Sequence, residues 1–172
     1  MKLTDDLLQK FNEQITLEFE ASMVYRQLAI AADDLDLSGM AAWLRHQADE
    51  EIVHANKFID HVADRDSFPT IGAIPAPPVQ AGLSALEIFR AALAHEQKVS
   101  EQIRQITRVA DEVGDLGDAG VERRRVGAFD DEGDAAAAGA VERVAAQVEA
   151  GIAPLDGGEP FGDAAFQQAE GV

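Results

Sequence analysis

Apolar and small side chains recur every three or four positions near the start of the chain. Between residues 4 and 32 this repeat runs through Leu7, Phe11, Ile15, Ser22, Tyr25 and Ala29. Such spacing places one of these side chains per turn on a single face, the pattern of an amphipathic helix. Thr4 is the predicted N-cap, because its hydroxyl can accept from a free backbone N–H of the first turn. The pattern predicts a helix over residues 4–32 whose apolar face is interrupted at position 18.

Two further segments show the same periodicity and predict helices over residues 38–64 and 84–113. Ser38 is the predicted N-cap of the first, and Ser84 with Glu87 forms a capping box at the start of the second. Residues 65–82 between them contain four prolines and two glycines. A segment of this composition is not helical, so it is predicted to be a long crossover between distant helix ends.

The last third of the chain has a different character. Glycines at positions 117, 120, 127 and 133 weaken any helix there, and only residues 134–150 keep a thin apolar stripe. Residues 151–172 contain five glycines and two prolines and are predicted to be a flexible tail. The chain is therefore predicted to be an all-α, up-down four-helix bundle with one long crossover and an atypical fourth helix.

Composition and charge narrow the classes of partner. The 172 residues suit one domain, and a formal net charge of −18 argues against nucleic acid and anionic membranes while favouring cations. The chain has no cysteine, so a metal site must use carboxylates and imidazole. No apolar run is long enough to span a membrane, and acids stand where a secretory signal would be apolar. A cytoplasmic location is expected.

Each of the first three predicted helices carries an acid within its apolar stripe: Glu18, Glu51 and Glu96. Each acid lies about 18–21 Å along its helix from the cap, at the rise of 1.5 Å per residue, so all three are expected at one level of the bundle. Burying an unpaired carboxylate costs several kcal/mol, and a shared cation would offset this cost. His54 follows Glu51 by three residues, the Glu-x-x-His spacing of di-iron sites in bundle cores.

Other polar residues leave two interpretations open. Tyr25 is in phase with the stripe and is either an ordinary core residue or a phenol close to the metal. Gln47 is either a hydrogen-bond partner of a ligand or a buried amide bonded to backbone. Three histidines fall off the stripes and are predicted to lie at the surface: His46, His61 and His95.

Residues 1–116 resemble a bacterial non-haem ferritin. The resemblance is carried by separate motifs that occur in order: residues 12–18 with Tyr25, residues 43–54, the Phe68-Pro crossover, and residues 95–97. It implies a ferritin-like di-iron domain, expected over residues 1–150, that acts as a ferroxidase and stores ferric mineral in a 24-subunit shell. The expected reactants are Fe²⁺ and dioxygen or peroxide.

The same resemblance implies roles for individual residues. Glu18, Glu51 and His54 would hold the first iron, Glu51 would bridge, and Glu96 would help to hold the second. Tyr25 would lie beside them. Ile52 stands where haem-binding relatives have a methionine, so no haem is expected.

Residues 117–172 depart from the family pattern. The iron ligand that the family carries on its fourth helix is not evident here, although Glu132 could substitute for it. Gly, Ala, Val, Asp and Glu, whose codons all begin with G, make up three quarters of this segment but two fifths of residues 1–116. A shifted reading frame near residue 117 would produce that bias.

Three interpretations of the whole chain follow. It is a ferroxidase, a non-catalytic or frameshift-damaged ferritin subunit, or a DNA-protecting relative of the ferritins. The acids inside the bundle disfavour the last of these, because the DNA-protecting relatives place their iron ligands between subunits.

Overall fold

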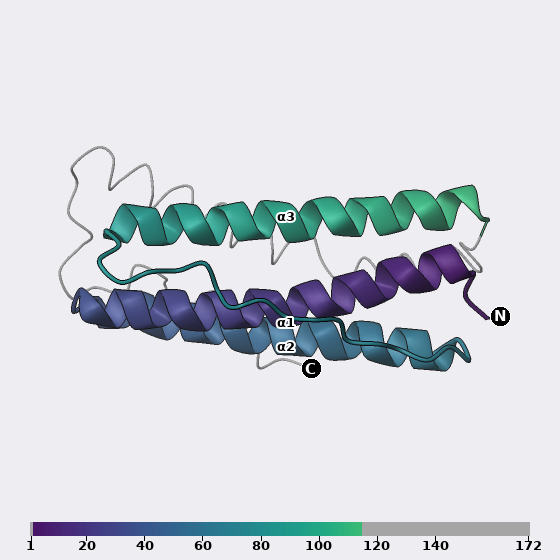
Figure 1. Ribbon diagram of the computed structural model, residues 1–172, viewed down its shortest axis with the longest axis horizontal. Coiled ribbons are helices and arrows are strands. Elements are labelled where there is room, and N and C mark those ends of the chain that lie inside the picture. Colours follow the sequence, from purple (N-terminus) through teal and green to yellow (C-terminus); the bar gives the residue numbers. More distant parts are fainter. Residues whose placement is uncertain (1, 115–172) are drawn as a thin grey trace, which may run out of the picture.

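The computed structural model describes residues 2–114, which form three long helices (Figure 1). They are α1 (Asp5–Asp34), α2 (Ser38–Asp64) and α3 (Ala85–Glu112). This part of the chain contains no strand, so the prediction of an all-α fold is confirmed. None of the three helices is long and apolar enough to cross a bilayer. The helix predicted over residues 134–150, the tail predicted over 151–172 and Glu132 lie outside the described residues.

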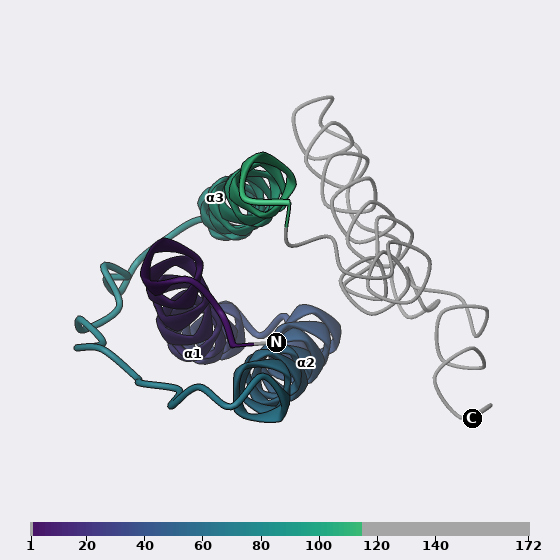
Figure 2. The same ribbon diagram turned by 90° about the vertical axis from the view of Figure 1, so that its right-hand side faces the viewer.

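The connections place the helices side by side along their whole length. A tight turn at residues 35–37 joins α1 to an antiparallel α2, and residues 65–84 then run back along the bundle to the start of α3 (Figure 1). As a result α3 is antiparallel to α1. Viewed end-on, the crossover passes on the outer side of α1 (Figure 2). Helix α1 contacts both α2 and α3 and thereby links them.

Two of the three predicted helix starts are as expected, and one is wrong. The Thr4 hydroxyl accepts from the Leu7 N–H at 3.4 Å, and both halves of the Ser84–Glu87 capping box form. In α2, however, Ser38 is the first helical residue, and Leu37 is the N-cap without a side-chain hydrogen bond. Leu37 packs against the core cluster next to the turn. The start of α2 thus has an apolar contact to the core but no side-chain cap.

The outer face of α1 holds the crossover in place. The Thr70 N–H donates to Asn12 Oδ1 at 2.9 Å, and the Gly72 N–H donates to Thr16 Oγ1 at 2.8 Å. A Cβ added at Gly72 would lie 3.2 Å from Thr16 Oγ1, which explains the glycine at this close approach. A segment without helix or strand is thus fixed by side chains one helical turn apart.

The core is divided into two apolar clusters with a polar layer between them. One cluster gathers residues from the α1–α2 turn end, with Ile88 and Ala92 of α3. The other gathers residues from the opposite end, with Phe58, Val62 and Ile106. The buried polar side chains of the three helices are Gln14, Glu18, Ser22, Gln47, Glu51 and Glu96. Any chemistry of the bundle interior therefore takes place in a layer closed by apolar side chains at both ends.

Phe58→Ala tests the contribution of the second cluster. The Phe58 side chain is 1 % exposed, and its ring lies 6.0 Å from that of Phe11, so its loss should lower the free energy of unfolding by about 3–5 kcal/mol. Val53 lies on the same helix with 52 % of its surface exposed, so Val53→Ala should change stability by less than about 0.5 kcal/mol. Urea denaturation measures both. Equal losses in the two variants would contradict this account of the core.

Candidate metal centre

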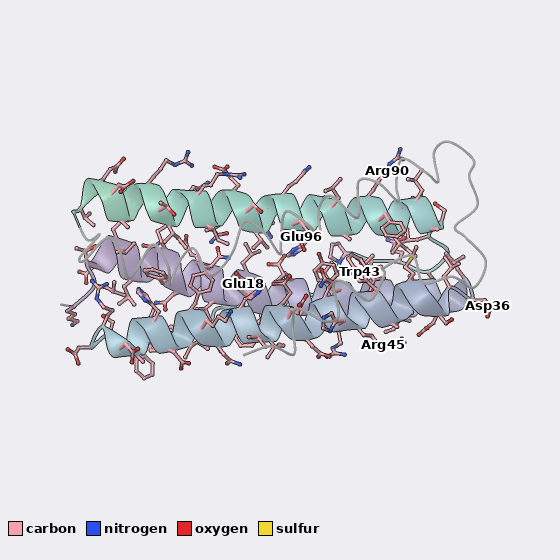
Figure 3. All side chains as sticks on the ribbon, turned by 180° about the vertical axis from the view of Figure 1, so that it is seen from behind. Glu18, Asp36, Trp43, Arg45, Arg90 and Glu96 are labelled. Carbon is pink, nitrogen blue, oxygen red and sulfur yellow. The ribbon has the colours of Figure 1, made fainter. Side chains whose placement is uncertain are left out.

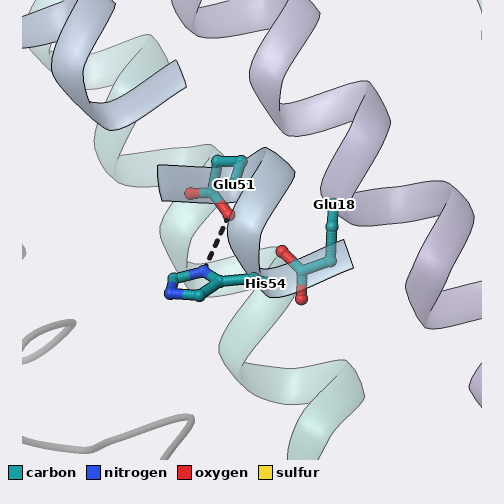
Figure 4. A group of neighbouring side chains, drawn as sticks. All are labelled: Glu18, Glu51 and His54. Carbon is teal, nitrogen blue, oxygen red and sulfur yellow. Dashed lines mark hydrogen bonds and ion pairs between the residues drawn. The ribbon is translucent and has the colours of Figure 1, made fainter. Parts of the chain in front are cut away.

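Glu18, Glu51 and His54 meet in the polar layer between α1 and α2. Each offers a ligand atom, and these atoms all lie within 4.8 Å of one another (Figure 4). Within residues 2–114 no other group of three or more metal-ligating side chains is this close. Helix α1 supplies Glu18, while Glu51 and His54 lie one turn apart on α2, because residues three positions apart share a helix face.

Burial dominates the electrostatics of this group. Glu18 is 1 % exposed, and this burial, followed by the neighbouring Glu51 carboxyl, raises the pKa of Glu18 well above its usual range. The hydrogen bond from Gln14 and the charge of His54 oppose this pKa shift. His54 Nδ1 lies 3.3 Å from Glu51 Oε2 (Figure 4). The two carboxylates repel each other when both are ionised, and a bound cation would offset this repulsion.

Glu96 lies in the same polar layer, but its carboxylate contacts Tyr25 and is not part of the group of Glu18, Glu51 and His54. It projects from α3 near the middle of the bundle, as Glu18 does from α1 (Figure 3). Glu96 is 7 % exposed, and its Oε1 accepts a hydrogen bond from the Tyr25 hydroxyl. The structure does not place Glu96 within the group formed by Glu18, Glu51 and His54.

Tyr25 is a core residue whose hydroxyl lies in the polar layer. Its ring is buried and packs edge-on against Trp43, with ring centroids 6.5 Å apart. Its hydroxyl reaches the carboxylate of Glu96 on α3. The side chain is therefore part of the core and of the polar layer at the same time.

The three histidines predicted at the surface differ in burial. His46 is exposed, with Nε2 lying 3.4 Å from Glu50 Oε1, and His61 is half-buried against the Phe11 ring at 4.8 Å. For His95 the prediction is wrong. Both its ring nitrogens are buried without a hydrogen-bond partner in the described part of the chain, and burial lowers its pKa. His95 turns toward α1, where its ring lies 6.5 Å from the ring of Tyr25.

Two glutamines show what the sequence could not decide. The Gln47 amide donates to the Glu50 carboxylate, so it bonds neither to backbone nor to one of the three clustered side chains. Gln14 was not singled out from the sequence, yet it is fully buried and its amide donates to Glu18 Oε1. Its spacing of four residues from Glu18 is the signal that could have found it.

The donor set favours a hard or borderline divalent cation. Two carboxylates balance the charge of one such ion, and an imidazole adds a nitrogen ligand that suits iron and zinc. Glu18 and Glu51 are buried, which strengthens the attraction between an ion and their carboxylates. Redox or hydrolytic chemistry at a bound ion is compatible with this set.

Comparison with known families settles which bundle this is. The model of the ferritin-like domain family matches residues 8–119. The chain belongs to the ferritin family. It is 30 % identical over 108 residues to a bacterial non-haem ferritin of Escherichia coli, a match that covers 63 % of this chain and 65 % of that protein. Against the bacterial non-haem ferritin of Staphylococcus saprophyticus the identity is 36 %, covering 63 % and 64 %. The chain thus matches less than two thirds of these relatives' length.

Solved ferritin structures share the fold of this ferritin-family chain. Apo-ferritin from Pseudo-nitzschia multiseries superposes with a TM-score of 0.75 at 26 % identity, covering 86 % of this chain and 90 % of that one. A variant of the ferritin PmFTN soaked in iron overnight gives a TM-score of 0.77 at 27 % identity, with the same coverage. The prediction of a ferritin-like bundle is confirmed.

The buried Glu18 carboxyl predicts a pH-dependent stability of the metal-free protein. Because its pKa is raised in the folded state, the folded protein holds a proton that the unfolded chain loses above the ordinary value of 4.5. Stability should therefore fall as the pH rises from 4.5 through the raised pKa. Glu18→Gln removes this penalty, so the metal-free variant should melt at a higher temperature than the wild type at neutral pH. The difference should shrink toward pH 4.5.

Glu13→Gln is the matched control on the same helix. Hydrogen bonds from Lys10 and Gln9 hold the pKa of Glu13 below its usual range, so this substitution should bring no gain at neutral pH. Thermal melts in the presence of a chelator measure both variants. A gain for Glu18→Gln that does not vary with pH would contradict the assignment.

Proposed function

We propose that this ferritin-family protein is an iron-storage ferroxidase that oxidises Fe²⁺ inside the helix bundle. The observation that carries the proposal is the buried group of Glu18, Glu51 and His54 in a ferritin-family fold. Fe²⁺ is the substrate, held first by these three side chains, with Glu51 as the bridge to a second iron. Glu96 would help to hold the second iron, with Tyr25 at its side.

Each side chain has a task in this proposal. The Glu18 and Glu51 carboxylates neutralise the incoming Fe²⁺, and Glu18 releases its proton as the ion arrives. His54 supplies the nitrogen ligand. Two Fe²⁺ ions give up one electron each. Dioxygen accepts these two electrons together with two protons and becomes hydrogen peroxide. If hydrogen peroxide is the oxidant, it accepts two electrons and two protons and becomes two molecules of water. The strong negative charge of the chain, −18, raises the local concentration of Fe²⁺ around the protein.

The proposal extends to the assembly and its surroundings. The protein would form a homo-oligomeric shell of 24 subunits that stores ferric mineral, in the cytoplasm and without nucleic acid or membrane as partners. It would use no haem, because Ile52 occupies the position of the haem-ligating methionine. The relatives named above support iron storage at the level of the family.

A second candidate function is a non-catalytic or frameshift-damaged subunit. It is favoured by one observation: the change of composition at residue 117 lies beside the end of the family match at residue 119. Translation of the coding DNA in the other two frames tests it. A Glu-rich helix with aromatic residues in one of those frames would support the damaged subunit, and no such helix would reject the frameshift.

Glu51→Ala and His54→Ala test the ferroxidase. Each removes a ligand of the first iron, so each should slow the oxidation of Fe²⁺ by at least about tenfold. Stopped-flow absorbance of the ferric product, after anaerobic loading with Fe²⁺, measures the rate.

His46→Ala is the matched control, since His46 lies on the same helix, is exposed and is not in the clustered group. Its oxidation rate should equal that of the wild type. Wild-type rates in both ligand variants would reject the site, and a wild-type chain that binds Fe²⁺ without oxidising it would favour the non-catalytic subunit.

Size-exclusion chromatography tests the shell. A shell of 24 chains of 18.4 kDa elutes in the range of several hundred kilodaltons, far from a single subunit. We expect the large species for the purified chain. Elution as a monomer or a dimer would contradict the proposed assembly without bearing on metal binding at the bundle interior.

A further inference from the structure

Gln14 is a fully buried amide whose one described hydrogen bond is to a proposed iron ligand. It is 0 % exposed, and its Nε2 donates to Glu18 Oε1 one helical turn farther along α1. Its own Oε1 is buried and has no hydrogen-bond partner within residues 2–114. The amide nitrogen of Gln14 therefore has a hydrogen-bond partner at the proposed metal centre, and the amide oxygen has none among these residues.

Packing alone gives no reason for an amide at this position. Phe11 and Ile15 lie next to Gln14 on α1 and belong to the apolar cluster that also contains Phe58. A methionine would fill the same space without leaving a buried carbonyl oxygen unpaired, and such oxygens destabilise a fold. The presence of the amide points to a use for its N–H group.

The orientation of the amide follows from the chemistry of its partner. When Glu18 is ionised, as it would be with an ion bound, its carboxylate only accepts hydrogen bonds, so in that state the –NH₂ side of Gln14 faces Glu18 and the carbonyl side points away. This bond occupies Oε1 of Glu18. The other oxygen, Oε2, is buried and has no hydrogen-bond partner in the described part of the chain. Oε2 is thus the oxygen that remains for an ion.

We propose that Gln14 is a positioning residue of the metal centre, which holds the Glu18 carboxylate so that it binds the ion through Oε2 alone. The inference rests on the proposed iron site. Without the amide, the Glu18 side chain can rotate about its terminal torsion and present either oxygen, or both, to the ion. A hydrogen bond to a ligating carboxylate fixes its orientation, and loss of such a bond weakens metal binding by about 10–100-fold in metal sites generally.

Gln14→Met and Gln47→Met form a matched pair for the test. Both replace a buried glutamine on a helix of the polar layer by an apolar side chain of similar length. Gln14 donates to the ligand Glu18, whereas Gln47 donates to Glu50, which lies outside the clustered group. Calorimetric titration of the full chain with Zn²⁺ should give a Kd about 10–100-fold weaker for Gln14→Met and a Kd close to that of the wild type for Gln47→Met.

The visible spectrum of bound Co²⁺ separates positioning from simple loss of stability. The ligand-field bands depend on how many oxygens each carboxylate contributes, so they should shift in Gln14→Met and stay unchanged in Gln47→Met. Gln14→Asn provides a second test if the methionine variant loses helix content by circular dichroism. It keeps an amide in the core, but its side chain is one methylene too short to reach Glu18, so the same shift is expected.

The outcomes distinguish this inference from the function on which it rests. Wild-type Kd and wild-type Co²⁺ bands in folded Gln14→Met or Gln14→Asn overturn the role of Gln14 and leave the iron site intact. Equal effects in Gln14→Met and Gln47→Met also overturn it, because the loss then follows from core polarity rather than from Glu18. The proposed function is overturned instead if the wild-type chain does not bind Zn²⁺ or Co²⁺, or if Glu51→Ala and His54→Ala bind them as the wild type does.

Discussion

Burial of three carboxylates in the middle of a helical bundle is the constraint on which the rest of this structure depends. Glu18, Glu51 and Glu96 are each no more than 7 % exposed. Water cannot solvate them there, so each must be protonated, hydrogen-bonded or neutralised by a cation. The polar layer between the two apolar clusters contains the groups that meet this need, and the clusters keep the layer dry.

Helix α1 organises that layer. It carries Glu18 itself and supplies the two donors that bind carboxylates inside the bundle, Gln14 to Glu18 and Tyr25 to Glu96. It also contacts both other helices and fixes the crossover through its outer face. A change in the position of α1 would therefore alter the geometry of the site and the path of the chain together.

The polar layer would couple metal binding to the stability of the fold. In the absence of an ion, the like charges of Glu18 and Glu51 and the loss of hydration disfavour ionisation, and the raised pKa of Glu18 expresses this cost. An ion that binds the folded state alone removes the cost and shifts the folding equilibrium toward the bundle. The carboxylates that cost stability without a cation would therefore add stability when they bind one.

The three helices, the long crossover predicted over residues 65–82, and the inward faces that carry Glu18, Glu51 and Glu96 could all be predicted from the sequence. Helical periodicity and depth from the caps are local properties, and they suffice to predict which residues face the core and at which level. Thr4 and Ser84 are N-caps as predicted, because capping depends on a hydroxyl and a backbone N–H a few residues apart.

Which of these groups touch one another depends on how the helices pack against each other. Periodicity gives the face of a helix, but it gives neither the side-chain rotamer nor the residue on the opposite helix. For that reason the pairing of Glu96 with Tyr25, the bond from Gln14 to Glu18 and the inward turn of His95 were not evident from the sequence. The start of α2 was not predictable for the same reason, because Leu37 packs against a core assembled from distant segments.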